Sequence, residues 1–495
     1  MGNNTTKHIA VIGSGFSGLA AACTLAQKGY RVTVLEKNEK AGGRGRSFSA
    51  EGFVFDMGPS WYWMPEVMEE FFQSFGKSTS EYYSLKRLDP GYRVFLKDQS
   101  IDVAADLEKI KSLFESIEPG AGAALEQFLK EAEEKYSAGM GKFVRKPAHH
   151  FMEFAEWDLM KALFKIQLFS NMRAHLKSHF KNPTLLQLLE FPVLFLGAKP
   201  SKTPALYSLM NYADLGLGTW YPMGGMAKVP EAMMALAESL GVKIETNQNV
   251  IGFEFEDNEI TAVKTQNQTW IIDGVIASAD YHHIEQELLP QAYRQYDEAY
   301  WEKRTMSPSS LLFYVGLDRK VPGLEHHNLF FENSFDKHAE EIYDNPQWPT
   351  DPLFYLCCPS KTDASVAPEG KENMFFLIPV APGLTSTEAL RDQYWEGMCD
   401  AVQRRTGIDI RPHVIYKRSF AHEEFKSEYN SYKGNAYGLA NTLMQTAFLK
   451  PKMKSSKLAN LYYAGQLTVP GPGMPPGYNQ RTIGGRGNRQ NIKLN

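Results

Sequence analysis

Residues 8–22 read His-Ile-Ala-Val-Ile-Gly-Ser-Gly-Phe-Ser-Gly-Leu-Ala-Ala-Ala. A short apolar run leads into Gly-x-Gly-x-x-Gly and then into a segment with helical character. Gly13 permits a tight turn, Gly15 lets the backbone approach a pyrophosphate, and Gly18 allows close packing of helix on strand. The helix N-terminus offers free N–H groups to the phosphates. The stretch predicts a dinucleotide-binding βαβ unit.

A second apolar run, Arg31 to Leu35, ends in Glu36, about 20 residues beyond the glycines, where an acid hydrogen-bonds a ribose hydroxyl. A lone Gly-x-Gly-x-x-Gly could be a chance turn, but the flanking strands and the acid favour a nucleotide site. The nucleotide-contacting residues predicted in this unit are Gly13, Ser14, Gly15, Phe16, Ser17, Gly18, Glu36 and Lys37.

The composition excludes several classes of protein. The chain has 495 residues, enough for two or more domains, and its formal net charge of −4 argues against nucleic acid as a partner. Its four cysteines show neither metal-site nor disulfide spacing, which fits a reducing cytoplasm. His326-His327 has no matching ligand spacing beside it, so no metal is predicted. No apolar stretch is long enough to cross a bilayer.

Two further motifs follow the first unit. Gly42-Gly43-Arg44 keeps the backbone flat beside a cofactor and supplies an arginine for phosphate, although a basic surface turn is the alternative. A strand then ends in Gly58-Pro59-Ser60, and the large aromatics Trp61, Tyr62 and Trp63 come directly after it.

These motifs resemble the flavin-dependent amine oxidase superfamily and, within it, the bacterial-type phytoene desaturases (carotenoid desaturases and isomerases). The resemblance covers nearly the whole chain and implies FAD rather than NAD. The FAD is expected to be bound without a covalent link, because no cysteine lies near the C-terminal strand and turn, residues 461–476. The resemblance places the adenine near Val250. It also implies that the turn following the last strand (residues 461–466) lies beside the isoalloxazine. The cofactor-contacting residues that it adds are Gly43, Arg44, Gly58, Pro59, Ser60, Val250, Gly465, Gln466 and Met474.

The expected fold class is α/β, with three parts. A Rossmann-like FAD-binding domain is expected from residues 1–84, 222–290 and 420–495. A mixed-sheet substrate domain is expected from 85–135 and 291–419. The remaining residues, 136–221, are expected to form a helical region that associates with membranes.

Residues 151–181 carry a basic amphipathic pattern. Lys161, Lys165, Arg173, Lys177 and Lys181 recur at multiples of four, with no acid between the first and the last. Such a helix can lie on an anionic membrane surface, or it can pack its apolar side in the core and leave a solvated basic face. Arg173 is also a candidate for a charged residue near the reacting bond. The sequence identifies no general base.

The function that the resemblance implies is FAD-dependent desaturation of a long-chain polyene, most simply phytoene to lycopene. A late-pathway desaturase of γ-carotene-type or hydroxylated carotenoids is the alternative within this class. A flavin-free lipid-binding escort protein of the same fold is the alternative from another class, and the intact nucleotide motif argues against it. The protein is expected to be cytoplasmic and peripherally associated with the cell membrane, with a quinone or oxygen as electron acceptor.

The C-terminal residues depart from the family pattern. The family continues after Pro476 with a small-residue helix, whereas this chain is rich in Gly, Asn and Arg from Gly477 on, which makes a poor helix. Codons exist for residues 478–492 that, read one base later, encode Ile-Ile-Ser-Gly-Gln-Leu-Val-Ala-Glu-Glu-Ile-Ala-Lys-Ile and a stop. A frame-shifted ending is therefore predicted, with a natural divergent tail as the alternative, and sequencing the gene across this region distinguishes them.

Overall fold

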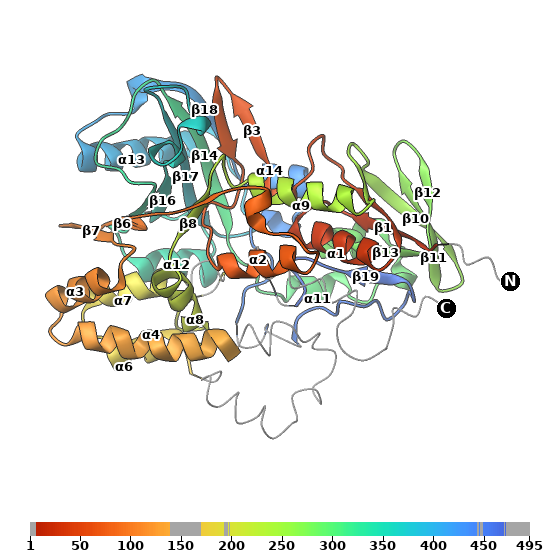
Figure 1. The fold of residues 1–495 in the computed structure, drawn as a ribbon, viewed down its shortest axis with the longest axis horizontal. Helices are drawn as coiled ribbons and strands as arrows, with labels where there is room; N and C mark the ends of the chain where they lie inside the picture. Colours follow the sequence, from red (N-terminus) through yellow and green to blue (C-terminus); the bar gives the residue numbers. More distant parts are fainter. Residues whose placement is uncertain are drawn as a thin grey trace.

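A computed structural model describes residues 6–138, 170–192, 197, 199–442, 445, 449–469 and 471. Two β-sheets lie at opposite ends of the molecule, and a group of helices lies beneath one of them (Figure 1). Four features predicted from the sequence fall outside the described residues: Lys161, Lys165, Met474 and the tail from Gly477.

The first sheet is parallel and has the strand order β19-β13-β1-β2-β9. Its central strands are buried along nearly their whole length, as expected for a parallel sheet that is covered on both faces. The strands are β1 His8–Ile12, β2 Arg31–Leu35, β9 Lys243–Glu245, β13 Gly274–Ala277 and β19 Leu461–Tyr463.

Two helices pack side by side against this sheet: α1 Phe16–Gln27 and α9 Lys228–Ser239 (Figure 1). A turn precedes α9, in which Gly224 and Gly225 both have positive φ. A three-stranded antiparallel sheet extends the domain: β10 Val250–Glu256, β11 Glu259–Thr265 and β12 Thr269–Ile271.

The second large sheet is mixed, with the order β18-β14-β17-β16-β15-β6-β7, in which only the β15–β6 pair is parallel. Its strands are β6 Tyr92–Phe95, β7 Ser100–Val103, β14 Ser309–Leu317, β15 His327–Phe330, β16 Phe354–Cys357, β17 Glu372–Val380 and β18 Val414–Phe420. One face packs on α13 Glu388–Thr406, and the other face joins the main core shared with the first sheet.

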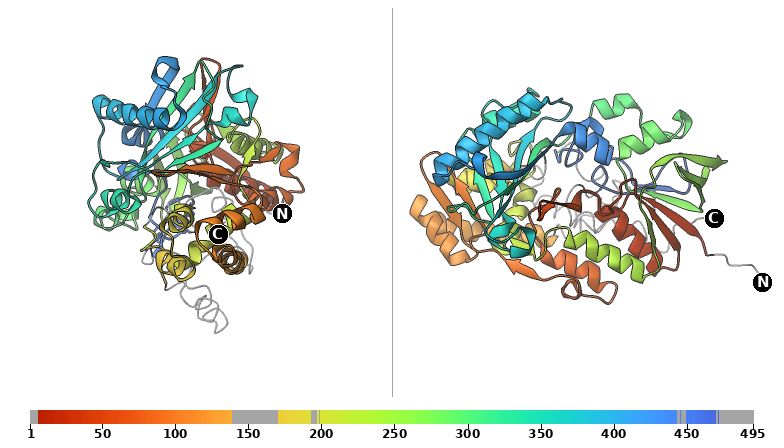
Figure 2. Two further views of the ribbon diagram at one scale, coloured as in Figure 1. Left: turned by 90° about the vertical axis from the view of Figure 1, so that its left-hand side faces the viewer. Right: turned by 90° about the horizontal axis from the view of Figure 1, so that it is seen from above.

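A helical group lies below the mixed sheet in Figure 1 and at the bottom of the left view in Figure 2. Its members are α3 Leu107–Ile117, α4 Ala121–Ala138, α6 Met172–His179, α7 Pro183–Glu190 and α8 Leu209–Asn211. The other helices are α2 Pro65–Gln73, α10 Tyr281–His283, α11 Glu298–Glu302, α12 Phe335–Tyr343 and α14 His422–Tyr429. Two small antiparallel pairs complete the fold: β3 Ser47–Ala50 with β4 Phe53–Asp56, and β5 Leu85–Arg87 with β8 Trp220–Pro222.

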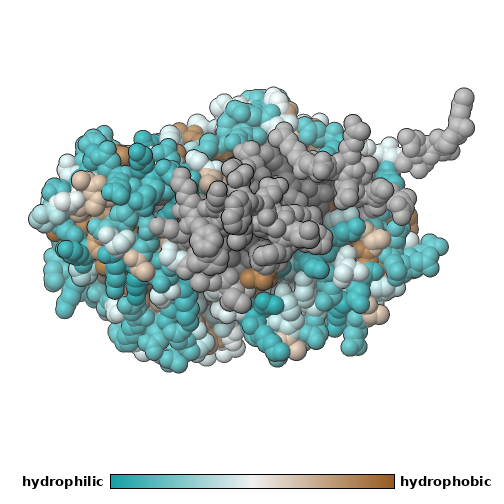
Figure 3. All heavy atoms as spheres, turned by 90° about the horizontal axis from the view of Figure 1, so that it is seen from below, coloured by the Kyte–Doolittle hydropathy of each residue, from teal (hydrophilic) through white to brown (hydrophobic). Residues whose placement is uncertain are grey.

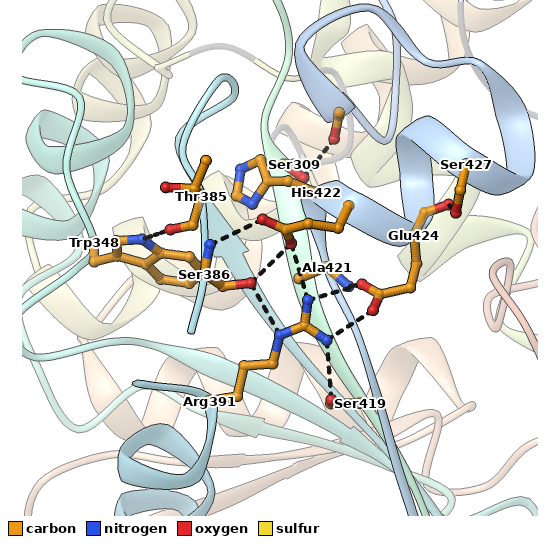
Figure 4. Close-up of polar contacts among 12 residues, drawn as sticks. Ser309, Trp348, Thr385, Ser386, Arg391, Ser419, Ala421, His422, Glu424 and Ser427 are labelled. Atoms are coloured by element: carbon orange, nitrogen blue, oxygen red, sulfur yellow. Dashed lines mark hydrogen bonds and ion pairs between the residues drawn. The ribbon is translucent and has the colours of Figure 1, made fainter. Parts of the chain in front are cut away.

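An arginine joins α13 to α14 where the chain leaves the mixed sheet. The Arg391 guanidinium donates to both Glu423 and Glu424, at 2.9 Å each, and also to Ser386 (Figure 4). Glu424 in turn accepts from the backbone N–H of Ala421, the N-cap of α14. The cluster fixes the angle at which the chain returns to the first domain.

No helix in the described part of the chain is long and apolar enough to cross a membrane. On the face in Figure 3 the described surface is mainly hydrophilic, with hydrophobic residues scattered singly.

Candidate cofactor and substrate site

The glycine turn lies at the carboxyl edge of the parallel sheet, between β1 and α1. Gly13 has φ +97°, and its backbone N–H donates to Leu35 of β2. A Cβ built on Gly18 would overlap the carbonyl oxygen of Gly13, so this position requires glycine. A Cβ on Gly15 meets nothing within 4 Å, and α1 has no side-chain cap, so its first N–H groups face open space. Open space beside uncapped helical N–H groups fits a diphosphate.

Glu36 organises this turn from the end of β2. One of its carboxylate oxygens accepts from the backbone N–H and hydroxyl of Ser14, at 3.1 and 2.6 Å. The other accepts from the backbone and side-chain N–H groups of Asn38. The Ser14 hydroxyl also accepts from Gly42 N–H at 3.0 Å. The acid thus ties three segments together, a structural role that the motif alone did not indicate.

The Gly42-Gly43-Arg44 segment packs directly on the glycine turn. Gly43 has φ +57°, and a Cβ there would lie 2.9 Å from Gly15 Cα. Arg44 donates to Ser431 Oγ at 2.6 Å and lies over the ring of Tyr429. Its Nε is buried and has no hydrogen-bond partner among the described residues, so the guanidinium retains a donor for a phosphate.

The remaining predicted residues are distributed around the same edge. A Cβ on Gly58 would lie 2.7 Å from the carbonyl oxygen of Arg44, so the Gly58-Pro59-Ser60 turn abuts the phosphate-facing segment. Val250 begins β10 and is buried. Gly465, at φ +125°, follows β19, and the Gln466 amide donates to Asn435 at 3.2 Å. Lys37 is turned away and bonds Ser427 and Asn430 instead. Gly15, Arg44 and the uncapped helix together fit the diphosphate of FAD.

An aromatic cluster adjoins this edge, on the inner face of the mixed sheet. Trp61, which follows the Gly-Pro-Ser turn, stacks on the His327 ring at 4.0 Å between centroids. Its other ring neighbours, at 5.3–5.6 Å, are Trp63, Tyr92, Phe191 and Tyr355. Such a surface suits a long apolar polyene.

A group of buried polar side chains lies against this cluster, and the sequence pattern did not predict that they come together. His327 on β15 pairs with Cys357 on β16, which puts both on the face of Trp61. The His326 and His327 Nδ1 atoms bond Thr362 and Tyr355 hydroxyls at 2.7 and 2.6 Å. Their Nε2 atoms have no hydrogen-bond partner in the described chain. The group is called the polar subsite below.

Tyr221 completes the polar subsite. The centroids of the Tyr221 and His326 rings are 4.7 Å apart. The buried Tyr221 hydroxyl also lacks a hydrogen-bond partner among the described residues. Burial lowers the pKa of His326 to about 3, so its imidazole is neutral. Three buried polar atoms without partners require an explanation, since each such atom costs about 1–3 kcal/mol.

Arg173 is partly exposed and is ion-paired on both sides. Its guanidinium forms a two-bond ion pair with Glu190, at 2.6 and 2.7 Å, and a further contact of 2.6 Å with Asp336. These hydrogen bonds raise the pKa of Arg173 above its ordinary value. The arginine links α6 to α7 and α12, and its predicted place near the reacting bond stays a prediction.

A buried carboxyl links the helical group to the aromatic cluster. Asp214, in a single π-helical turn, accepts from the Tyr92 hydroxyl at 2.9 Å and from the Thr219 hydroxyl at 3.3 Å. Burial raises the pKa of Asp214 to about 7. Between pH 4 and 7 the folded protein keeps a proton that the unfolded chain has released, so stability falls as the pH rises through this window.

We therefore expect Asp214→Asn to make the free energy of unfolding less dependent on pH. The wild type should lose on the order of 2–4 kcal/mol more between pH 5 and 8 than the variant does. Urea denaturation at both pH values measures this difference. Asp98→Asn, at an exposed position, is the control. Equal pH dependence in wild type and Asp214→Asn would contradict the prediction.

Comparisons with known proteins agree with this geometry. The model of the flavin containing amine oxidoreductase family matches residues 16–474. The chain is 43% identical over 477 residues to a carotenoid 3,4-desaturase of Haloarcula japonica, covering 96% of each chain. It is 30% identical to a zeta-carotene-forming phytoene desaturase of Myxococcus xanthus, covering 95% of this chain and 91% of that one. The fold matches an oxidoreductase from Methanosarcina mazei with a TM-score of 0.57 at 16% identity, covering 96% and 99%.

The family model matches the chain from the start of α1 to beyond β19, including the mixed sheet and the aromatic cluster, and the relatives cover nearly the full length of the chain. The chain belongs to the flavin-containing amine oxidoreductase family, in its carotenoid desaturase branch.

Proposed function

We propose that this protein desaturates a carotenoid late in its pathway, at the C3–C4 bond of an end group that carries a hydroxyl. The observation that carries the choice of bond is the 43% identity to a carotenoid 3,4-desaturase, against 30% to a phytoene desaturase. Phytoene to lycopene is the second candidate, supported by the Gly58-Pro59-Ser60 turn with its following aromatics, which resembles phytoene desaturases.

FAD bound without a covalent link would supply the redox chemistry of the site, as the acceptor of the hydrogen removed from the polyene. The chain's own residues supply binding and position. The glycine turn, Arg44 and the uncapped α1 hold the diphosphate, and the Trp61 cluster holds the polyene and excludes water. A quinone or oxygen is the proposed final electron acceptor.

The polar subsite supports the hydroxylated substrate. A hydrocarbon end group offers no partner to Tyr221 Oη or the two histidine Nε2 atoms, whereas a hydroxyl both donates and accepts. A site built to bond a hydroxyl discriminates strongly against an analogue without one, because the buried polar groups are then left unpaired.

The test is an incubation of the FAD-loaded protein with liposomes that carry phytoene, lycopene or a carotenoid hydroxylated at its end group, followed by chromatography of the pigments. We expect product from the hydroxylated carotenoid at a rate at least about tenfold above that from lycopene. Phytoene converted faster than both would favour the second candidate.

We further propose that the protein reaches its substrate from a membrane surface, through the basic part of its helical group. Lys177 on α6 and Lys181 after it are exposed, whereas Arg173 is ion-paired with Glu190 and Asp336. Each basic residue near an anionic surface contributes about 1 kcal/mol at low salt.

Lys177→Glu with Lys181→Glu should therefore weaken flotation with anionic liposomes, by about tenfold or more at low salt. Lys457→Glu, at an exposed position in the other domain, is the control for net charge. Unchanged flotation of the double variant would mean that these lysines form an ordinary solvated basic face.

A further inference from the structure

Lys450 lies just beyond the carboxyl end of β19. The chain that follows it runs antiparallel along the outer edge of that strand, with Lys454 paired to Tyr462 and the Tyr463 N–H donating to Met453 at 2.7 Å. Continuing three residues back from Met453 brings the chain past the end of the strand. Lys450 is therefore at the edge of the parallel sheet where the glycine turn also lies.

The lysine side chain is buried and its ammonium has no hydrogen-bond partner in the described part of the chain. Lys450 is 4% exposed, and its Nζ is among the buried polar atoms without a partner. A Cβ built on Gly471 would lie 3.0 Å from this Nζ, so the ammonium sits against the backbone of the turn after β19. Gly471 has φ +125°, and only glycine suits both that conformation and the space.

Leaving a buried ammonium without a partner is unfavourable by several kcal/mol, so a buried lysine either has an anionic partner or loses its proton. Burial alone lowers the pKa of Lys450 to about 7, and no described acid acts against that shift. The lysine therefore points to an anion that binds at this edge of the sheet.

The order of the strands indicates which part of FAD that anion belongs to. The diphosphate is expected at the turn after β1, and the adenine ribose at Glu36 after β2. The sheet order β19-β13-β1-β2 then leaves the riboflavin half to extend in the opposite direction, over β13 toward β19. Lys450, beyond β19, lies at the flavin end of the cofactor and two strands away from the diphosphate turn.

We propose that Lys450 supplies the positive charge that stabilises the anionic reduced form of the bound flavin. The inference rests on the flavin-dependent oxidation proposed above, and it adds a residue that sets how readily the flavin is reduced. A cation at this place binds the reduced cofactor more tightly than the neutral oxidised one, so it raises the midpoint potential.

The experiment compares Lys450→Met, Lys450→Arg and Lys452→Met. Lys450→Met keeps the length and removes the charge, Lys450→Arg restores the charge, and Lys452→Met is the same change at an exposed position two residues away. The midpoint potential of each FAD-loaded protein is measured against a redox dye under anaerobic conditions, and oxidised FAD affinity is measured by titration.

Lys450→Met should lower the midpoint potential while oxidised FAD binds with affinity within about threefold of wild type. A tenfold loss of preference for reduced over oxidised flavin corresponds to about 30 mV for a two-electron couple. Lys450→Arg should recover most of the shift, and Lys452→Met should show none. The midpoint potential reports on Lys450 whichever carotenoid is the substrate.

Two results would overturn the proposal. One is an unchanged midpoint potential in Lys450→Met, which would make the lysine a structural residue. The other is a folded Lys450→Met protein that no longer binds oxidised FAD, which would place the charge at the diphosphate instead. If Lys450→Met fails to fold, the midpoint potential and the affinity for oxidised FAD are measured in Lys450→Gln, which also removes the charge.

Discussion

Replacing Gly15 with valine is expected to remove FAD from the protein while leaving the fold of the cofactor-free chain unchanged. Gly15 has φ −69° and ψ 175°, which any residue adopts, and a Cβ there meets no other atom within 4 Å. The added side chain fills the space through which the diphosphate must approach the N–H groups of α1. We expect FAD affinity to fall about a thousandfold, or ~4 kcal/mol, in a fluorescence titration.

Gly18→Ala is the matched comparison for this prediction. Its Cβ would overlap the Gly13 carbonyl oxygen and lie 3.2 Å from Ser278 Cβ, so the helix would have to move away from the sheet. Gly18→Ala should therefore lower the thermal unfolding temperature of the cofactor-free protein, and Gly15→Val should not. Wild-type FAD affinity in Gly15→Val would show that the cofactor does not approach this turn.

Removing two of the polar groups from the polar subsite is expected to change which substrate the protein prefers. Tyr221→Phe deletes only the buried hydroxyl, and His327→Leu removes the imidazole beneath Trp61. Together they should lower kcat/KM for a hydroxylated carotenoid by about 10²–10³. The same two substitutions should leave kcat/KM for a carotenoid without a hydroxyl unchanged or slightly higher. They remove two of the three buried polar atoms that have no partner among the described residues, Tyr221 Oη and His327 Nε2.

Tyr293→Phe, at a tyrosine that stacks on Phe255 of β10 and donates to the Asp257 carbonyl, controls for the loss of a tyrosine hydroxyl. Equal losses on both carotenoids would mean that the polar subsite supports the fold and does not bind the substrate. Metal analysis adds a second check, since a ligand atom each from His326, His327 and Cys357 lie within 4.8 Å of one another. One equivalent of zinc or copper, lost in His327→Leu, would make this group a metal centre.

The elements that depend on neighbouring residues in the chain were predictable from sequence. The turn at Gly13 to Gly18, the strands on each side of it and the acid at position 36 all follow from local pattern, and the structure confirms the parallel sheet that they build. The mixed sheet was also expected, because its strands are long apolar runs such as residues 309–317.

What depends on pairing between distant segments was not predictable. The sequence predicts no metal site at His326-His327, because no cysteine follows at a suitable spacing. The β15–β16 register nevertheless brings Cys357 opposite His327, thirty positions along the chain. The ion pairs of Arg173 were likewise not predictable, because Glu190 and Asp336 are too remote in sequence to be recognised as its partners.

The most direct test of the account is an anaerobic single turnover. FAD-loaded protein is mixed with a hydroxylated carotenoid in liposomes, without any electron acceptor, and the flavin absorbance and the pigments are followed together. We expect the flavin to bleach as the carotenoid spectrum shifts to longer wavelength, with one new double bond formed for each flavin reduced. A product formed while the flavin stays oxidised, or no bleaching with any carotenoid, would contradict flavin-dependent desaturation.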